Sequence, residues 1–293
     1  MIDLHIHTSN SDGMYSTFDI LKMSEEKNLN TISICDHNKL EAYYDLKKIN
    51  IKDYYSGKII PGIEFDFTYK KKLFHMLGYS FDIDKLNMSE YIDRNTDEDN
   101  LKFEKEKFEY LKSVCIKLGI KLSDNLEVTN PNLPANDVIK IDMLSHKENN
   151  EILDKLLGKN REISFWRGHV TNPESPFYID YTKGVPDVKI ICDEIHKCNG
   201  IVVLPHVFEY KSINNIEFLN DIYNMNLIDG IECIHTKHTK EQTEFLKRFA
   251  KEKGLLISGG SDFHNKVDHI LGYGDKGNLE ITDEYCLKKV IDA

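Results

Sequence analysis

Two histidines and an aspartate lie within the first residues of the chain, in the stretch MIDLHIHTSNSDG. His5 and His7 are two positions apart in an apolar run typical of a β-strand. Their side chains are therefore expected on one face, and those of Leu4 and Ile6 on the other. Two imidazoles that converge beside a strand end can bind a divalent metal ion, with Asp12 close behind in the sequence. This pattern favours a metal site over a pair of ordinary core histidines.

Further imidazoles and carboxylates stand in or directly after later apolar runs. The candidate metal ligands are His5, His7, Asp12, His37, Glu64, His75, His206, Asp262 and His264. These donor types suit Mn, Zn or Fe better than an ion that prefers thiolates. The donors exceed what one ion can use, so we expect two or three divalent ions that share a carboxylate. Asp36, beside His37, is expected to orient a ligand or to cap a turn.

Seven apolar runs that end in polar residues are typical of β-strands: MIDLHIH, TISICDHN, KIIPGIEF, KLFHMLGY, GIVVLPHV, LIDGIECIH and LLISGGSDFH. Helical patterns at 17–28, 187–199 and 240–253 separate several of them. This order predicts an α/β fold with a mostly parallel sheet. The candidate ligands fall at the C-terminal ends of the strands, the edge at which barrels and open α/β sheets form their sites.

The middle of the chain breaks this rhythm because it is highly charged. Residues 98–118 predict a helix, and two loops rich in Pro and Asn, TNPNLPAND and TNPESPF, follow. We interpret residues 87–182 as a mostly helical insertion domain, with 1–86 and 183–293 forming the barrel. In the alternative, 98–118 is a long surface helix of the barrel itself.

The composition bounds the function. The chain has 293 residues, with 40% hydrophobic and 30% charged residues, as in ordinary globular proteins. No apolar stretch approaches the roughly 20 residues of a membrane helix, and no secretory signal is evident, so we expect a cytoplasmic protein without a membrane partner. The six cysteines form no CxxC pair, which disfavours a zinc–thiolate site or a disulfide scaffold. The sequence does not predict the oligomeric state.

The formal net charge of −11 argues against a broad nucleic-acid surface. It is compatible with a small phosphorylated substrate, because bound metal ions supply positive charge locally.

Six motifs together resemble, in order, those of the PHP (polymerase and histidinol phosphatase) superfamily of metal-dependent phosphoesterases. They are DLHIHTSNSDG, ICDHN, PGIEF, FHMLGY, VVLPHV and SGGSDFH, and the resemblance covers about residues 1–86 and 183–275. The sequence is most similar to stand-alone bacterial members with a helical insertion after the fourth strand. The resemblance implies a distorted seven-stranded (β/α)7 TIM-like barrel with a small inserted helical domain.

The resemblance also implies a trinuclear metal site. It assigns His5, His7, Glu64 and Asp262 to one ion, Glu64, His75 and His206 to a second, and Asp12, His37 and His264 to a third. With the third ion, Asp12, His37 and His264 are expected to grip the phosphate and steady the leaving oxygen. The proton for the leaving group would come from a metal-bound water, His206 or His238.

The sequence departs from the family pattern at several points. Cys35 replaces the usual Thr of the second motif, and Val207 replaces the Pro after His206. Relatives with an insertion often carry an Arg-Pro-His stretch whose arginine faces the substrate phosphate. The similar piece here is Arg-Gly-His at 167–169, so Arg167 is a candidate phosphate clamp, or else a surface arginine. Trp166 beside it either stacks on a base or belongs to a core.

The run GIECIHTKHT after the sixth apolar segment contains Glu232, His235 and His238, and the family has a comparable GIE run. The two histidines either support a ligand, face the substrate or are ordinary surface residues.

The function expected from these observations is a phosphoesterase that hydrolyses a phosphomonoester or phosphodiester of a small nucleotide with water activated by two or three ions. Its substrate is a nucleoside monophosphate, a 3′,5′-bisphosphate or the 5′ end of a short single strand. Basic residues that could line a short groove are Lys140, Lys147, Lys155, Lys159, Arg161 and Arg167. The alternatives are a histidinol-phosphate phosphatase, a non-catalytic metal-binding PHP module, disfavoured because every ligand position is filled, and a metal-dependent amidohydrolase.

Overall fold

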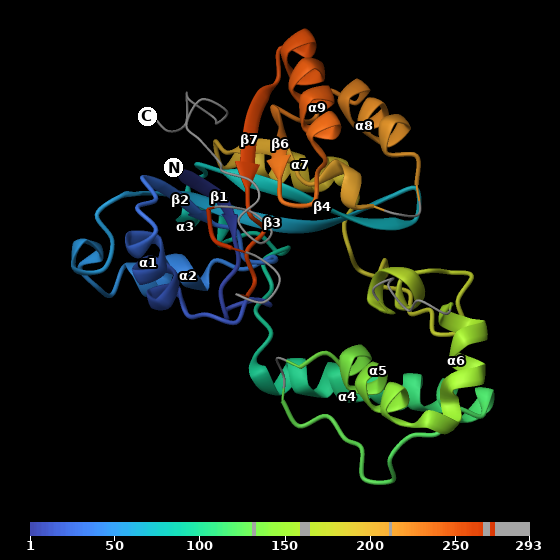
Figure 1. Cartoon of the computed structure of the whole chain (residues 1–293). Helices are drawn as coiled ribbons and strands as arrows, with labels where there is room; N and C mark the ends of the chain where they lie inside the picture. The colour runs from blue at the N-terminus through green and yellow to red at the C-terminus, as the bar shows by residue number, and fades with distance from the viewer. Residues whose placement is uncertain (131–132, 159–164, 211–212, 266–269, 273–293) are drawn as a thin grey trace. The chain divides into compact units, whose positions relative to one another are not determined.

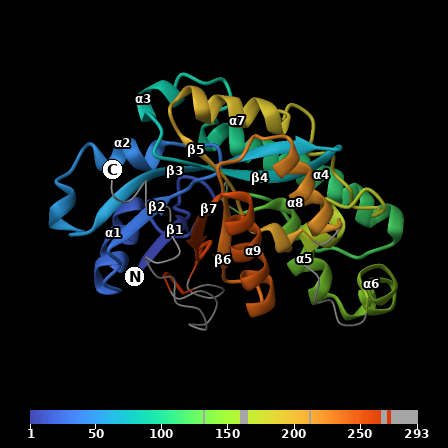
Figure 2. The ribbon, with the colours of Figure 1, turned by 90° about the horizontal axis from the view of Figure 1, so that it is seen from above.

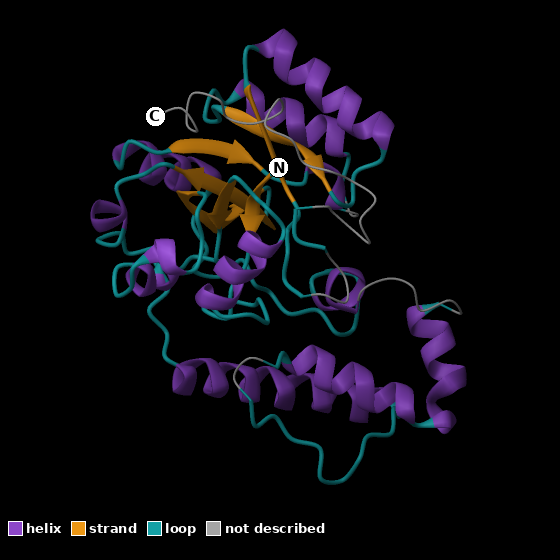
Figure 3. Ribbon diagram, turned by 60° about the vertical axis from the view of Figure 1, so that its left-hand side comes forward, coloured by secondary structure: helices purple, strands orange, loops and turns teal. Residues whose placement is uncertain are grey.

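The computed structural model describes residues 1–130, 133–158, 165–210, 213–265 and 270–272 of the chain. The described residues form two compact units, one from residues 1–93 with those from 184 onward and one from residues 94–183. The described strands all belong to the first unit, and the second consists of helices and loops (Figure 3).

The first unit contains one sheet whose strands follow each other in chain order (Figure 1). They are β1 (Ile2–Ile6), β2 (Thr31–Ile34), β3 (Lys58–Tyr69), β4 (Lys72–Tyr79), β5 (Ile201–Leu204), β6 (Gly230–His235) and β7 (Leu256–Gly260). The main-chain N–H of His7 donates to the carbonyl of Phe263, 2.9 Å away, and so joins the end of β1 to the segment after β7. The sheet is thus a nearly closed barrel, and the predicted seven-stranded α/β barrel is confirmed.

One strand departs from the parallel pattern. β4 runs antiparallel to both β3 and β5, whereas the other paired neighbours are parallel. A tight turn at Lys70 and Lys71, with φ values of 46° and 59°, joins β3 to β4. Consecutive positive φ angles are the geometry of a two-residue hairpin, so this connection needs no helix. The reversal places His75 directly opposite Asp66 in the ladder.

A register shift interrupts the pairing of β1 with β2 between Asp3 and Ile6. Leu4 lies in a small apolar cluster with Ile2, whereas Ile6 lies in a larger cluster with residues of the outer helices. The expectation that Leu4 and Ile6 share a face is therefore wrong. An extra residue in one strand shifts the alternation of side chains, which sequence spacing alone does not reveal.

Two apolar layers hold the first unit together. The inner layer fills the barrel with residues from or beside every strand: Ile2, Leu4, Cys35, Ile60, Leu77, Tyr79, Val203 and Ile234, with Ile201 and Leu256 partly buried. The outer layer packs strands against helices α1 (Thr17–Glu26), α2 (Glu41–Leu46), α7 (Val188–Lys197), α8 (Asn215–Asn224) and α9 (Lys240–Lys253). Figure 2 shows these helices around the strands. Shorter helical turns are η1 (Ile51–Asp53), α3 (Ile83–Leu86) and η4 (Val207–Glu209).

Residues 94–183 have a hydrophobic core of their own. Their helical elements are α4 (Asp97–Leu118), α5 (Ala135–Ser145), η2 (Lys147–Asn149), α6 (Asn150–Leu157) and the π-helical turn η3 (Trp166–Val170). The helix predicted at 98–118 is confirmed as α4, which begins at a capping box between Thr96 and Asp99 and ends at Gly119 with φ 72°. The domain boundaries at 86/87 and 182/183 stay a prediction.

No helix in the described part of the chain has the length and apolar character needed to cross a membrane.

Gly260 marks the closest approach between β7 and β1. A Cβ atom there would lie 2.1 Å from the Cβ of His5 and 2.6 Å from its main-chain nitrogen. We expect Gly260→Ala to lower the free energy of unfolding by about 3 kcal/mol or more, because the backbone of β1 cannot yield without opening the barrel. Urea unfolding measures this.

Gly254→Ala is the matched control. Its φ of 69° strains any other residue, but among the described residues no atom lies within 4 Å of the added carbon. For this substitution we expect the free energy of unfolding to fall by only about 1–2 kcal/mol, the cost of the strained backbone alone. Equal destabilisation by the two substitutions would contradict the close packing of β7 against β1 at Gly260.

Candidate metal centre

The carboxylate of Glu64 in β3 lies at the middle of a cluster of imidazoles. Its side chain is 1% exposed. Oε2 lies 3.2 Å from Nε2 of His5, 3.2 Å from Nε2 of His7 and 3.5 Å from Nε2 of His37, and Oε1 lies 2.8 Å from Nε2 of His206 and 3.2 Å from Nδ1 of His75. One buried acidic group thus faces imidazoles from both edges of β3 and from across the barrel.

The nine predicted ligands lie together at this end of the barrel. Donor atoms within 4.8 Å of one another form four groups: His5–His7–Glu64–Asp262, Glu64–His75–His206, His7–Asp12–His37–His264 and His37–Asp66–His75. Each of the three sets implied by the resemblance is contained in one of these groups. The third group additionally contains His7, and the fourth introduces Asp66. The assignment of each residue to an ion stays a prediction.

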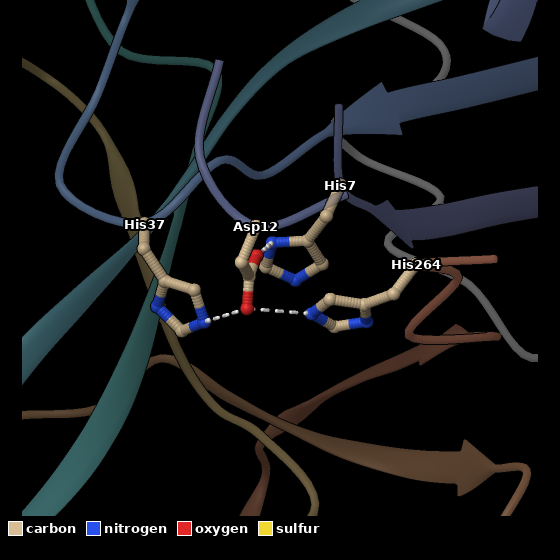
Figure 4. Close-up of side chains that lie close together, drawn as sticks. All are labelled: His7, Asp12, His37 and His264. Atoms are coloured by element: carbon tan, nitrogen blue, oxygen red, sulfur yellow. Dashed lines mark hydrogen bonds and ion pairs between the residues drawn. The ribbon is translucent and has the colours of Figure 1, made fainter. Parts of the chain in front are cut away.

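Asp12 joins residues from the first, second and last motifs (Figure 4). Its Oδ2 lies 3.1 Å from Nε2 of His264 and 3.7 Å from Nε2 of His37, and its Oδ1 lies 3.4 Å from Nδ1 of His7. Nδ1 of His264 lies 2.8 Å from the carbonyl oxygen of Asp262. Since a carbonyl only accepts, that nitrogen carries a proton, and in the neutral ring Nε2 then has its lone pair directed toward the cluster.

Burial and charge oppose each other in this cluster. Burial alone would raise the pKa of Glu64, but the charges of His5 and His37 outweigh it and hold that pKa well below its usual range. Burial likewise lowers the pKa of His5, yet the carboxylates of Glu64 and Glu232 outweigh it and hold that pKa well above its usual range. Positive charge is therefore required wherever these carboxylates are buried, and protons or metal ions can provide it.

Several imidazole nitrogens in the cluster are buried without a hydrogen-bond partner among the residues that the structure describes. They include both nitrogens of His7, Nδ1 of His37 and Nδ1 of His206. Such groups are costly to bury unless something binds them. Nε2 of His7 lies 3.2 Å from Glu64 and 3.3 Å from Asp262, so it shares a position with two carboxylates. The donor set therefore fits divalent metal ions.

The backbone is strained where two of the candidate ligands lie. His206 has φ 28° and Asp262 has φ 54°, both in the left-handed region that non-glycine residues rarely adopt. The turn at Asp262 is held by its neighbour Ser261, whose N–H donates to Oδ1 of Asp3 over 2.9 Å and whose hydroxyl donates to Oδ2. Burial raises the pKa of Asp3 to about 6. Strain at candidate ligands supports a functional role for the cluster.

Asp36 holds the turn that carries Asp12, in agreement with its predicted role. It accepts hydrogen bonds from the N–H and the hydroxyl of Thr8 and from the hydroxyl of Ser11, each over 2.7 Å. The loop after β1 is thereby tied to the end of β2.

Asp66 is a member of the cluster that the sequence analysis missed. Its Oδ1 lies 3.4 Å from Nε2 of His75 and 3.7 Å from Nδ1 of His37, and its Oδ2 accepts from the side chain of Asn38 over 2.9 Å. Asp66 is two residues after Glu64, a spacing that could have drawn attention to it. Its proximity to His75, however, depends on the antiparallel direction of β4.

Residues at the end of β6 and just after it extend the cluster. His235 is fully buried, and its Nε2 lies 3.5 Å from Oδ2 of Asp262. His238 is partly buried, with Nδ1 3.3 Å from the carbonyl oxygen of Cys233, and burial lowers its pKa to about 3. The alternative that both are ordinary surface residues is wrong, since His235 is fully buried and His238 is partly buried.

Arg167 lies in the second unit, in the turn Trp166–Val170, and its side chain lies outside what the structure describes. Its predicted contact with substrate stays a prediction. The ring of Trp166 lies 4.5 Å from that of Tyr181, and both are partly buried against the core of that unit. This agrees with the alternative that Trp166 is a core residue.

Metal binding should stabilise the fold through Glu64. With Mn²⁺ at about a hundred times its dissociation constant, we expect the unfolding midpoint of chelator-stripped protein to rise by about 5 °C. In Glu64→Gln the rise should be much smaller, because the carboxylate shared by two of the groups is lost. Differential scanning calorimetry checks this, with the exposed substitution Glu244→Gln as control. An unchanged rise in Glu64→Gln would refute the shared site.

The PHP domain family model matches residues 3–160 of the chain. The matched region contains His5 to His75, and His206, Asp262 and His264 come after it. A Haemophilus influenzae protein named 5′-3′ exoribonuclease is 25% identical, and the alignment covers 96% of this chain and 95% of that protein. The Escherichia coli K12 protein named 5′-3′ exoribonuclease Rnm is 23% identical, over 89% of this chain and 84% of that one.

Two solved structures have a similar fold. One is a Bifidobacterium adolescentis protein assigned to the metal-dependent phosphoesterases, with a TM-score of 0.62 and 18% identity. The other is an amidohydrolase from Chromobacterium violaceum with bound sulfate and no metal, with a TM-score of 0.65 and 17% identity. Each covers 99% of this chain and 95% of the compared chain. At such identities the similarity concerns the fold. With more than half of its length matched by the family model, the chain belongs to the PHP domain family.

Proposed function

We propose that this protein is a metal-dependent phosphoesterase that shortens RNA from its 5′ end. The proposal is based on the cluster of imidazoles and carboxylates around the buried Glu64. Two or three ions, of Mn, Zn or Fe, suit these donors. Bound ions would neutralise phosphate oxygens and lower the pKa of a bound water to about 7, which provides a nucleophile at neutral pH.

The exposure of the candidate ligands indicates which side meets the substrate. The side chains of His5 and His7 are fully buried, whereas those of His37 and His264 are 23% and 22% exposed and that of Asp12 is 54% exposed. The group around Asp12 is thus the open side of the centre. In our proposal it receives the scissile phosphate, while the buried groups hold their ions away from solvent.

The relatives named 5′-3′ exoribonuclease support RNA as the substrate, since the alignments span nearly the whole chain. The net charge of −11 disfavours long duplexes, which bind through many contacts from Lys and Arg. A short single strand, or a nucleotide with a free phosphate, fits both facts. Basic residues of the proposed insertion, 87–182, would line a short groove, and Arg167 would clamp a phosphate.

The activity test uses short RNA with a 3′ label and added Mn²⁺. We expect stepwise shortening from the 5′ end with release of mononucleotides. Asp262→Asn should lower kcat more than about 100-fold, the scale of losing one electrostatic stabiliser of the transition state. Asp193→Asn, at an exposed ion pair on α7, is the control and should retain full activity.

Other substrates decide between the alternatives. Faster hydrolysis of histidinol phosphate than of RNA or 3′,5′-bisphosphates would favour the histidinol-phosphate phosphatase. Cleavage of amides alone would favour an amidohydrolase. Bound metal without turnover of any of these substrates would leave a non-catalytic module and refute the proposed function.

Arg167 has its own test. If it clamps a phosphate, Arg167→Ala should raise KM for RNA about 10- to 100-fold with a smaller change in kcat, the worth of a charge-assisted hydrogen bond. Arg167→Lys should recover part of this, because it keeps the charge but loses the planar fork. Lys121→Ala, at an exposed ion pair of the same unit, is the control. Unchanged KM in Arg167→Ala would assign Arg167 to the surface.

A further inference from the structure

We propose that Glu232 is a positioning residue for one candidate metal ligand in each of the two groups that share Glu64. It would position them by holding the ring of His5 and the main chain of His206. The inference rests on the proposed metal site and is independent of the substrate.

Glu232 lies in β6 and is fully buried. Its Oε1 lies 3.0 Å from Nδ1 of His5, and its Oε2 accepts the main-chain N–H of His206 over 2.9 Å. His5 comes from β1 and His206 directly follows β5. One carboxylate therefore connects residues that are about two hundred positions apart in sequence, with one oxygen directed at each.

The first contact decides which nitrogen of His5 can bind a metal ion. An ionised carboxylate only accepts hydrogen bonds, so Nδ1 of His5 carries the proton. Nε2 of the neutral ring then keeps its lone pair, 3.2 Å from Oε2 of Glu64 and 3.5 Å from Oδ1 of Asp262. This is the arrangement in which an outer carboxylate orients a ligating histidine.

The second contact stabilises an unfavourable backbone. His206 has φ 28° and ψ 48°, and its N–H would lack this partner without Glu232. Its ring Nε2 lies 2.8 Å from Oε1 of Glu64, so the direction of the ring depends on this turn. Glu232 therefore acts on His5 in the first group and on His206 in the second, and both meet at Glu64.

Glu232→Gln separates positioning from simple packing because it keeps the size of the side chain. An amide has one accepting oxygen and one donating nitrogen. If the oxygen faces His206, the amide nitrogen meets Nδ1 of His5 and moves the proton of that ring to Nε2, where the ion would bind. If the oxygen faces His5, two donors meet at His206. Either orientation breaks one of the two contacts.

The test is calorimetric titration of chelator-stripped protein with Mn²⁺, together with the visible spectrum of the Co²⁺-loaded protein. We expect Glu232→Gln to weaken Mn²⁺ binding about 10- to 100-fold and to alter the Co²⁺ spectrum. Glu232→Asp, which cannot span both contacts, should behave similarly. Glu244→Gln, an exposed change on α9, should match the unsubstituted protein.

The outcomes separate this inference from the proposed function. If Glu232→Gln and Glu232→Asp both bind Mn²⁺ as tightly as the unsubstituted protein, the positioning role is refuted, whatever the activity. If the unsubstituted protein binds no Mn²⁺, the metal site and the role of Glu232 are refuted together. If Mn²⁺ affinity falls as expected but no phosphate ester is hydrolysed, Glu232 positions metal ligands and only the proposed function fails.

Discussion

The structure depends on one buried carboxylate that must be surrounded by positive charge. Removing an ionised group from water costs several kcal/mol, and Glu64 is almost fully buried. The compensating contacts come from imidazoles in β1 and β4 and in the segments after β1, β2 and β5, and so these segments must meet at Glu64. The barrel is the arrangement that meets this requirement.

Closing the barrel around such a cluster has local consequences. β4 reverses direction, so that His75 approaches Glu64 and Asp66 from the neighbouring strand. Gly260 leaves room for β1 at the seam, and the backbone is strained at His206 and Asp262. A strained backbone persists when the surrounding contacts hold it in place. At Asp262 these contacts are the two hydrogen bonds that Asp3 accepts from the neighbouring Ser261. The inner apolar layer beneath the cluster gives those contacts a rigid base.

The cluster changes character from its buried side to its open side. His5, Glu64 and Glu232 are sealed from solvent, where electrostatic interactions are strong and proton positions are set by fixed partners. Asp12 and His264 are partly exposed and can meet a charged ligand. In the proposed function, the buried side would hold the ions and the open side would receive the phosphate. Residues 94–183 have a separate core and so form a distinct unit within the same chain.

The sequence by itself determined the seven strands, their order and the donor types at their ends, because period-two apolar runs and short polar endings are local signals. It therefore identified the nine residues that gather at one end of the barrel. Only the tertiary structure decided the direction of β4, the register shift in β1 and the contacts of Asp66 and Glu232. These depend on which strands pair and where side chains from distant segments meet. Local spacing carries no information about either, since pairing is set by the free energy of the whole packed chain.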